Sequence, residues 1–506
     1  MNRFWVLLCA VVLWCADAIL LPGAEVVINV VDTATDAAVP CRMHLRDSAG
    51  EAVLSETLPS YRDHFVCPGT ATLDLPAGEY TYEVERGPEY VAATGMFTVV
   101  DGAKKDVAIT IARITDMAAA GWWSGELHVH RDVQDIELLM QAEDLHIAPV
   151  ITWWNNRNVW KDQAIPEQLL VRFDGNRFYH LMAGEDEREG GALLYFNLTR
   201  PLEIIGATRE FPSPMAFLQT ARQHKQVWVD IEKPFWWDVP IWLASGQVDS
   251  IGLANNHMCR SRMYEDEAWG KPRDEQRLPA PRGNGMWTQE LYYKILNSGL
   301  RIPPSAGSAS GVLPNPVGYN RVYVQLDGEL AYDAWWAGLR DGRSFVTNGP
   351  LLKVTANGKL PGHIFKAKAN GPFDVNLVAD ITGRDEIDVI EVIQNGEVVQ
   401  SLTPNAQSFS GELPAITFDR SGWFLVRVRC KNPRTFRFAS TAAYYVEIGD
   451  EPQRVSKSAA QFFVDWVEER TARVKLTDPQ MRRAVLKHHK TAREFWQDRV
   501  KAANAD

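Results

Sequence analysis

Hydrophobic and polar positions follow different periods in different parts of the chain. Between residues 25 and 115, apolar and polar residues alternate with the period of two that is typical of half-buried β-strands, and turn residues separate the runs. The same alternation returns over residues 351–450, where Asn395-Gly396 marks a hairpin turn. We therefore predict a β-sandwich in each of these two regions.

The region from residue 120 to residue 350 has another pattern. Apolar, strand-like runs alternate with segments of helical period, and polar clusters directly follow the apolar runs. Polar chemistry at the carboxyl ends of successive strands is typical of βα barrels. From residue 455 to residue 506 the pattern is helical, with Pro479 suited to the first position of a helix. The predicted fold is thus multidomain α/β plus β, with a barrel between two β-sandwiches and a C-terminal helical tail.

The first 18 residues predict a secretory signal peptide. They begin Met-Asn-Arg, continue with a short apolar run and reach the small residues Ala16 and Ala18. The apolar run is shorter than the roughly 20 residues that a membrane span needs. Because no later segment is apolar enough either, we expect no stable membrane insertion. The mature protein is expected to be exported to the periplasm or the extracellular space.

Composition narrows the functional classes. The chain has 506 residues, of which 46% are hydrophobic and 23% charged, and this is the balance of a globular protein. The net charge of −11 disfavours nucleic acid as a partner, because binding to phosphates needs a basic face. The 18 tryptophans, several of them in adjacent pairs, indicate aromatic walls or pockets. None of these quantities sets the oligomeric state.

The cysteines are few. Removal of the predicted signal peptide leaves Cys41, Cys67, Cys259 and Cys430. None lies in a Cys-x-x-Cys pair, so a thiolate zinc site is not predicted. Cys41 and Cys67 fall within one predicted β-sandwich, where they either pair or remain free.

The segment Gly125-Glu-Leu-His128-Val-His130 gives the sharpest chemical signal. Residues two apart in an extended strand face the same side, so both imidazoles can reach one metal ion. Neutral imidazole suits Zn, Mn or Fe, and added carboxylates would complete a hydrolytic site.

The surrounding sequence, Gly121–His130, resembles the opening motif of the PHP (polymerase and histidinol phosphatase) superfamily, specifically its CehA/McbA-type metallohydrolases. Gly184-Glu185, residues 296–308 and residues 338–350 extend the resemblance, in the expected order. It runs from about residue 120 to the C-terminus. The resemblance implies a distorted (β/α)7 barrel and metal-dependent hydrolysis of ester, carbamate or phosphoester bonds.

The chain departs from the family pattern at several ligand positions. Trp153-Trp154-Asn155 stands where the family carries Asp-His-Asn, residues 230–234 lack a histidine, and residues 307–311 lack an acid and an imidazole. The histidine pair and Glu185 are retained. The resemblance therefore implies a reduced site, with one ion rather than three.

Side chains at predicted strand ends supply the candidate site. The predicted metal ligands are His128, His130, Glu185 and His257. The predicted proton-transfer groups are Glu187, Glu232 and Asp230. The predicted substrate contacts are Trp153, Trp154, Asn155, Trp236, Trp237 and Lys233, with Lys233 also suited to neutralise Glu232.

Three hypotheses of function follow. The first is a metal-dependent hydrolase acting on a small molecule or a glycan. The second is a non-catalytic relative that keeps the fold as a ligand- or glycan-binding protein. The third is a metal-free carbohydrate-active enzyme in which Asp and Glu pairs cleave a sugar stacked on indoles. Dependence on a metal ion distinguishes the first hypothesis from the other two.

Overall fold

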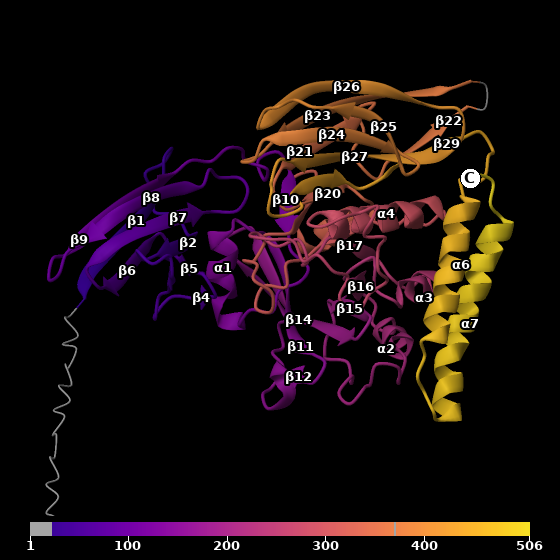
Figure 1. Ribbon diagram of the computed structural model, residues 1–506, viewed down its shortest axis with the longest axis horizontal. Helices are drawn as coiled ribbons and strands as arrows, with labels where there is room; N and C mark the ends of the chain where they lie inside the picture. Colours follow the sequence, from indigo (N-terminus) through magenta and orange to yellow (C-terminus); the bar gives the residue numbers. More distant parts are fainter. Residues whose placement is uncertain (1–22, 369–370) are drawn as a thin grey trace, which may run out of the picture.

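The computed structural model describes residues 23–368 and 371–506, so the predicted signal peptide lies outside the described residues. Figure 1 shows an N-terminal β region on the left, a mixed central region, a β-sandwich above it and a helix pair on the right. More of the described residues lie in strands, which form several sheets, than in the seven α-helices. The prediction of a multidomain, β-rich protein is confirmed.

The N-terminal region packs two sheets around one core. Alternate residues of the first strand, such as Val26, Ile28 and Val30, are buried in that core, which explains the period of two in the sequence. The first sheet contains β6 (Thr70–Leu75), β1 (Ala24–Asp32) and β9 (Lys105–Ile111). The second contains β4 (Ser60–Tyr61), β5 (His64–Cys67), β2 (Cys41–Arg46), β7 (Gly78–Glu85) and β8 (Ala93–Val99), with β3 (Ala52–Val53) on β2.

Cys41 and Cys67 face each other across β2 and β5. They are direct partners in the antiparallel register, and their Sγ atoms lie 3.6 Å apart as free thiols. Cross-strand partners have the Cα separation that a disulfide needs. We expect an oxidant to remove two protons and two electrons from the pair. The resulting disulfide should stabilise the N-terminal sheets by about 3 kcal/mol, because it restricts the unfolded chain between the two cysteines.

Intact-mass spectrometry of the oxidised protein should show a mass about 2 Da below that of the reduced protein, the mass of two hydrogens lost in forming the bond. The Cys259→Ser variant should keep this difference, and the Cys41→Ser variant should lose it. Four titratable thiols in the oxidised protein would contradict the pairing.

The central region is built on a curled, mixed sheet. Register pairs connect its strands in the order β19, β10, β11, β14, β15, β16, β17, β18. The strands are β10 (Trp122–Gly125), β11 (Ile147–Trp154), β14 (Arg177–Arg188), β15 (Gly191–Phe196), β16 (Trp228–Ile231), β17 (Ser250–Ala254), β18 (Pro304–Ala306) and β19 (Arg321–Gln325). Two short strands, β12 (Arg157–Asn158) and β13 (Leu170–Phe173), pair with β11 and β14.

The predicted (β/α)7 barrel over residues 120–350 is not confirmed, because the strands of the described residues form no closed barrel. Strands β14 and β15 pair antiparallel, and only two residues separate Arg188 from Gly191. A link this short makes a hairpin, whereas a parallel βαβ unit needs a crossover of a dozen or more residues. The sheet also continues through β20 (Ser344–Thr347), which pairs with both β19 and a C-terminal strand.

Helices cover the central sheet and form the C-terminal tail. Around the sheet lie α1 (Ile136–Ala142), α2 (Pro214–Ala221), α3 (Val239–Ala244), α4 (Gly283–Asn297) and α5 (Tyr332–Arg340). The tail consists of α6 (Lys457–Ala472) and α7 (Pro479–Lys501), side by side in Figure 1. Trp496 of α7 is buried and donates a hydrogen bond to the carbonyl of Pro240, which ties the tail to α3.

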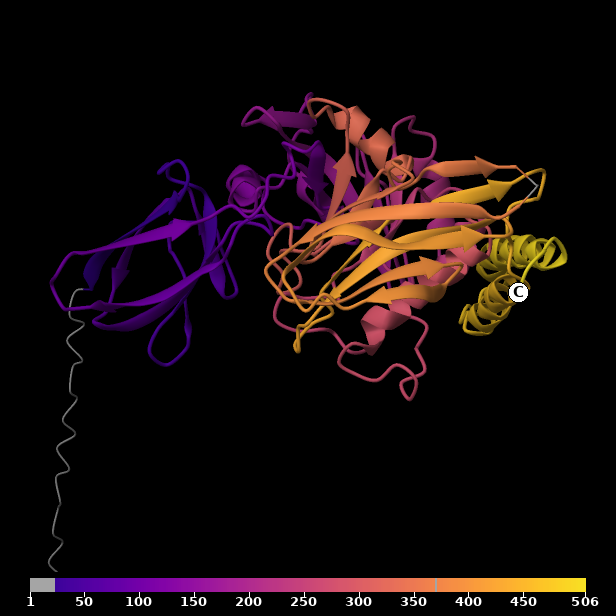
Figure 2. The same cartoon turned by 90° about the horizontal axis from the view of Figure 1, so that it is seen from above.

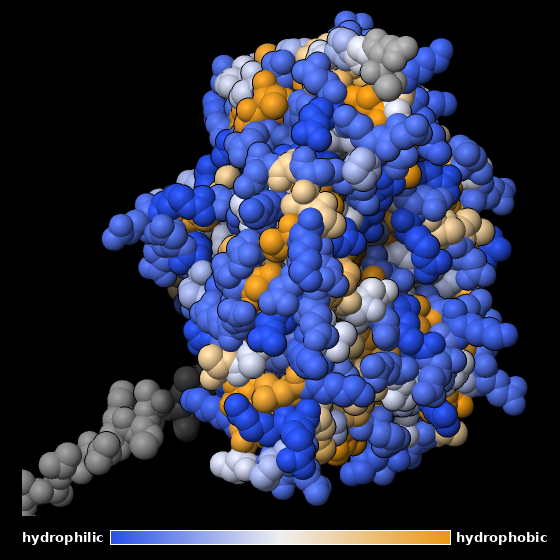
Figure 3. Space-filling model, turned by 90° about the vertical axis from the view of Figure 1, so that its right-hand side faces the viewer, coloured by the Kyte–Doolittle hydropathy of each residue, from blue (hydrophilic) through white to orange (hydrophobic). Residues whose placement is uncertain are grey.

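No helix in residues 23–368 and 371–506 combines the length and the apolar character that crossing a bilayer requires. Figure 3 shows the face that carries α6 and α7, where hydrophilic residues predominate and hydrophobic residues form small, separate patches.

The C-terminal sandwich shares a sheet with the central region. Asn395 and Gly396 both have positive φ, as a two-residue hairpin requires. Figure 2 shows the sandwich from above, next to the N-terminal region. One layer contains β21 (Leu351–Ala356), β23 (Phe373–Thr382) and β26 (Ser408–Phe418). The other contains β22 (Ile364–Ala367), β24 (Ile387–Gln394), β25 (Glu397–Leu402), β27 (Gly422–Cys430), β28 (Phe438–Thr441) and β29 (Tyr444–Ile448).

Candidate metal centre

His128 and His130 lie in the extended segment that follows β10. Leu127 N donates to the carbonyl of Ala306 at 2.9 Å, and His130 N donates to the carbonyl of Ser310 at 2.8 Å. These bonds keep the segment extended, so residues 128 and 130 project to one side while Val129 enters a hydrophobic core on the other. The predicted convergence of the two imidazoles is therefore present.

Three ligand atoms form a small triangle. His128 Nε2 and His130 Nε2 lie 3.0 Å apart, and Glu185 Oε2 of β14 lies 3.4 Å from the first and 3.1 Å from the second. Ligand atoms about 2.0–2.1 Å from one Zn²⁺ lie roughly 3 Å from each other. All three side chains are at most 8% exposed. Both the donor set and the spacing fit one divalent ion.

Two glycines allow the backbone to approach the histidines. A Cβ on Gly307 would lie 2.4 Å from His128 Cβ. Gly311 has a φ of +100°, and a Cβ there would lie 2.4 Å from the carbonyl oxygen of His130. The loop after β18 can therefore be this close to the segment of His128 and His130 only with glycine at both positions.

Glu232 contacts the ring nitrogen of His128 that is not part of the triangle. Its Oε1 lies 3.5 Å from His128 Nδ1. Lys233 Nζ donates to the same oxygen at 2.6 Å, and Trp236 Nε1 donates to Oε2 at 2.9 Å. A carboxylate in this position keeps a proton on Nδ1 and leaves Nε2 available for a metal ion. Glu232 therefore orients the imidazole of His128, and Lys233 pairs with Glu232, in line with the interpretation that Lys233 neutralises this carboxylate.

The ionisable groups around the triangle shift one another's pKa values. Burial lowers the pKa of His128, but Glu185 and Glu232 outweigh burial and raise it to about 10. Burial raises the pKa of Glu232, and Lys233 and His128 more than offset this and lower it to about 2. Burial also raises the pKa of Glu185, which the two histidines hold well below its usual value. Without a metal ion, a protonated His128 thus lies between two carboxylates.

Glu187 lines a cavity of about 380 Å³, together with Asn155 and Trp269. Glu187 Oε2 accepts a hydrogen bond from Trp154 Nε1 at 3.1 Å, and the Trp154 ring centre lies 4.8 Å from that of His130. Asn155 Oδ1 accepts the backbone N–H of Glu187 at 2.9 Å. Burial, followed by repulsion from Glu185, raises the pKa of Glu187 to about 7. Among the predicted proton-transfer groups, Glu187 is the one that adjoins the cavity.

Asp230 and His257 bond to other partners. Asp230 Oδ1 accepts hydrogen bonds from the hydroxyls of Ser250 and Ser305, both at 2.5 Å, and burial raises its pKa to about 7. His257 Nδ1 lies 3.1 Å from the carbonyl oxygen of Asp266, and burial lowers the pKa of His257 to about 3. Among the described residues, the group that could hold an ion here does not include either side chain.

Trp153 and Trp237 lie in the hydrophobic core. Trp153 packs against Gly184, where an added Cβ would come within 1.8 Å of the indole. Trp237 is buried under Arg473, whose guanidinium carbon lies 3.9 Å from the ring centre. These two indoles stabilise the central region and the attachment of the tail. Of the predicted tryptophans, Trp154 is the one that is partly exposed.

Sequence reasoning missed Trp269 and Glu126. Trp269 is 49% exposed, lies in the wall of the cavity and stacks on Trp236 with ring centres 6.2 Å apart. No local pattern distinguishes it from the other tryptophans. Glu126 accepts the backbone N–H groups of Ser308, at 2.6 Å, and of Gly318. Glu126 stands two residues before His128, so the strand period that identified the two histidines could also have identified Glu126.

A second group that could hold an ion, in the N-terminal region, comprises His44, Asp63 and His64. Asp63 lies 3.3 Å from His44 Nδ1 and 3.0 Å from His64 Nδ1. Arg42 Nε donates to His44 Nε2 at 3.1 Å, so the ring proton of neutral His44 lies on Nδ1. A metal ion in the N-terminal group would have to displace this proton and lie beside the Arg42 guanidinium, and the repulsion between the two cations disfavours this group.

Comparisons with known proteins give little help. No family model matches the chain, and no curated protein matches it. One similar solved structure is the CARDB domain of a Pyrococcus furiosus protein, with 16% identity, 20% of this chain and 97% of that chain covered, and a TM-score of 0.14. Another is the Bacillus anthracis TIE protein, with 8% identity, 84% of this chain and 50% of that chain covered, and a TM-score of 0.14. Neither likeness supports an argument about fold or function.

Proposed function

We propose that this protein is an exported, metal-dependent hydrolase that holds one divalent ion and cleaves ester, carbamate or phosphoester bonds. The observation that supports the proposal is the triangle of ligand atoms from His128, His130 and Glu185, with sides of 3.0, 3.1 and 3.4 Å. The resemblance to PHP-type metallohydrolases points to the same chemistry and to a related, PHP-like fold of the central region.

Each side chain of the site has a distinct role. His128, His130 and Glu185 would bind the ion, and Glu232 would keep the proton of His128 on Nδ1. A bound Zn, Mn or Fe ion supplies a Lewis acid that polarises the scissile bond and activates water. Glu187 would accept the proton of the attacking water on its carboxylate and pass it to the leaving group, for which a pKa of about 7 is well suited.

The adjoining cavity suits a small molecule or a single sugar unit. Its volume is about 380 Å³, within the range of small-molecule sites. Trp269 and Asn155 lie in its wall beside Glu187. An apolar ring face of the substrate could stack on the exposed indole while the scissile bond reaches toward His130.

Elemental analysis of the mature chain, purified without chelators or a metal-affinity column, tests the proposal. We expect about one Zn, Mn or Fe ion per chain, because the structure brings together one set of three ligands at this site. Hydrolysis of nitrophenyl esters and phosphoesters should stop with a chelator and return with the metal. Folded protein that contains no metal and takes none up on dialysis would overturn the proposal in favour of glycan binding. Chelator-resistant hydrolysis of glycosides would favour the enzyme with Asp and Glu pairs.

We expect the affinity for the metal ion to rise with pH. His128 must lose the proton on Nε2 before this atom can bind the ion, and its pKa of about 10 means that the proton is present at neutral pH. The apparent association constant should therefore increase about tenfold per pH unit between roughly pH 7 and pH 9. Competition with a chelating dye across this range measures the slope. Affinity that does not change with pH, once the dye is corrected for, would contradict this protonation state.

A further inference from the structure

Three regions of the protein meet at a small, partly enclosed, arginine-rich cavity. Its volume is about 40 Å³, enough for a few water molecules or one small ion. The N-terminal sheet, the central region and the C-terminal sandwich all contribute to its wall. The arginines that line it are Arg42, Arg260, Arg321, Arg384 and Arg437. The carboxylates that line it are Glu85, Glu143 and Asp385.

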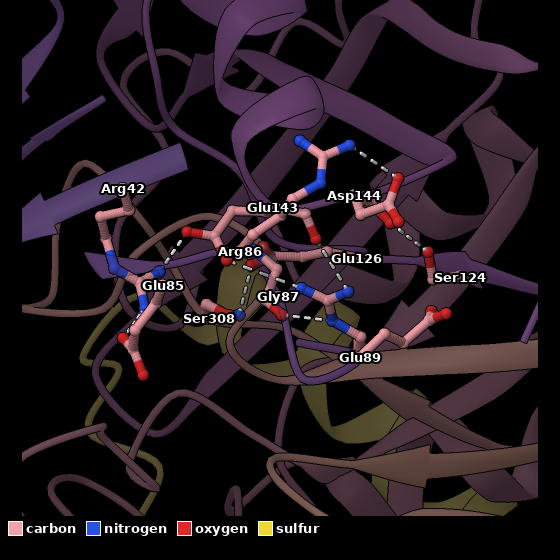
Figure 4. A network of polar contacts seen from close by, with 12 residues as sticks. Arg42, Glu85, Arg86, Gly87, Glu89, Ser124, Glu126, Glu143, Asp144 and Ser308 are labelled. Carbon is pink, nitrogen blue, oxygen red and sulfur yellow. Dashed lines mark hydrogen bonds and ion pairs between the residues drawn. The ribbon is translucent and has the colours of Figure 1, made fainter. Parts of the chain in front are cut away.

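Most of these charges are paired. Arg42 joins Glu85 to Glu143, as Figure 4 shows. Glu85 also accepts hydrogen bonds from Arg384 at 2.6 Å and from Arg260 at 2.9 Å. This one carboxylate therefore forms ion pairs with three guanidinium groups.

The wall nevertheless carries an excess of positive charge. Five guanidinium groups face three carboxylates, and Glu83, which pairs with Arg260 at 2.7 Å from a partly exposed position, brings the number of carboxylates to four. The neighbouring acids cannot supply the missing charge, because Asp144 and Glu89 pair with Arg86, Arg113 and Arg177. One cation remains in excess.

Two N–H groups of the wall also lack partners. Within the described residues, Arg321 Nη2 and Arg437 Nε are buried and have no hydrogen-bond partner. Arg321 is 1% exposed, and the nearest carboxylate oxygen to its Nη2, on Glu143, lies 3.8 Å away. A water molecule would satisfy these donors but not the excess charge, whereas a small anion would satisfy both.

We propose that this cavity binds one small monovalent anion, of the size of chloride, which joins the N-terminal sheet, the central region and the C-terminal sandwich. The anion accepts hydrogen bonds from Arg321 and Arg437 and neutralises the one positive charge that the four carboxylates leave uncompensated. The site lies apart from the His128 triangle and does not depend on the proposed hydrolase activity.

Thermal unfolding of the mature chain in different sodium salts tests this site. At constant ionic strength, replacing gluconate, which is too large for the cavity, by chloride should raise the Tm by about 2–5 °C and saturate with concentration. Arg437 pairs with Asp385 at 2.8 Å through Nη1, and its Nε has no partner among the described residues. Arg437→Gln removes one of the five guanidinium groups and this free donor, so its Tm should be the same in both salts. Arg301→Gln breaks an ion pair with Glu447 outside the cavity and should keep the chloride response.

A direct measurement covers the case in which Arg437→Gln fails to fold. Crystals of the wild-type protein soaked in bromide should show an anomalous scattering peak next to Arg321 and Arg437. Equal Tm values of the wild-type protein in chloride and gluconate, or bromide peaks found only elsewhere, would overturn the proposal. A chloride response that is the same in Arg437→Gln as in the wild-type protein would overturn it as well.

Discussion

Replacing His128 with alanine is expected to abolish metal binding while the protein stays folded. The change removes one of the three proposed ligands and also the imidazole that joins the two sides of the site, with Nε2 3.4 Å from Glu185 and Nδ1 3.5 Å from Glu232. With two of the proposed ligands left, we expect the affinity for the metal ion to fall by at least about a thousandfold and the proposed hydrolase activity to disappear with it. Elemental analysis and chelator-dye titration measure the first effect, and circular dichroism measures the fold.

The matched control is His257→Ala. This histidine is equally buried in the same region, but its Nδ1 lies 3.1 Å from the carbonyl oxygen of Asp266 and it is not part of the triangle. The variant should keep the metal ion. Loss of metal in His257→Ala together with retention in His128→Ala would contradict the assigned ligands.

Replacing Arg42 with methionine is expected to cause a large loss of stability. Arg42 is 4% exposed and pairs with both Glu85 and Glu143, which are themselves buried. Removal of the cation leaves Glu143 without its closest partner, and Arg384 and Arg260 compensate only Glu85. Breaking a buried ion pair on one side costs about 3–5 kcal/mol. Urea denaturation followed by circular dichroism measures the change in the free energy of unfolding.

Arg46→Met is the control in the same strand. Arg46 side-chain exposure is 44%, and its guanidinium lies 3.7 Å from Asp63, so we expect a loss of less than about 1 kcal/mol. Similar losses in the two variants would show that the junction of the three regions does not depend on the buried pairs.

Local sequence patterns predicted those parts of the site that lie close together in the chain. The convergence of His128 and His130 follows from the geometry of a single extended strand, which needs no knowledge of the rest of the fold. Asn395-Gly396 likewise forms the expected hairpin because both residues tolerate positive φ. The triangle with Glu185 was predicted through family resemblance, and the sequence contains no distance between residues 130 and 185.

Other features of the structure depend on partners that are distant in the sequence. The central sheet continues through β20 into β28 of the C-terminal sandwich, and its strands do not close into a barrel. Trp153 and Trp237 follow apolar runs as an indole wall would, yet Gly184 and Arg473 cover them. Trp269 stacks on Trp236 from a loop that has no periodic pattern.

The sequence by itself determined the β-rich, multidomain architecture, the helical tail and the direction in which the two histidines point. These features depend on periods of two or 3.6 residues, and the periods express which face of a single element is buried. The tertiary structure alone decided that Glu232 orients His128, that Glu187 adjoins the cavity, and that five arginines meet at one junction. The reason is physical: burial and charge compensation are set by all the groups that surround a side chain, and most of these groups come from other parts of the chain.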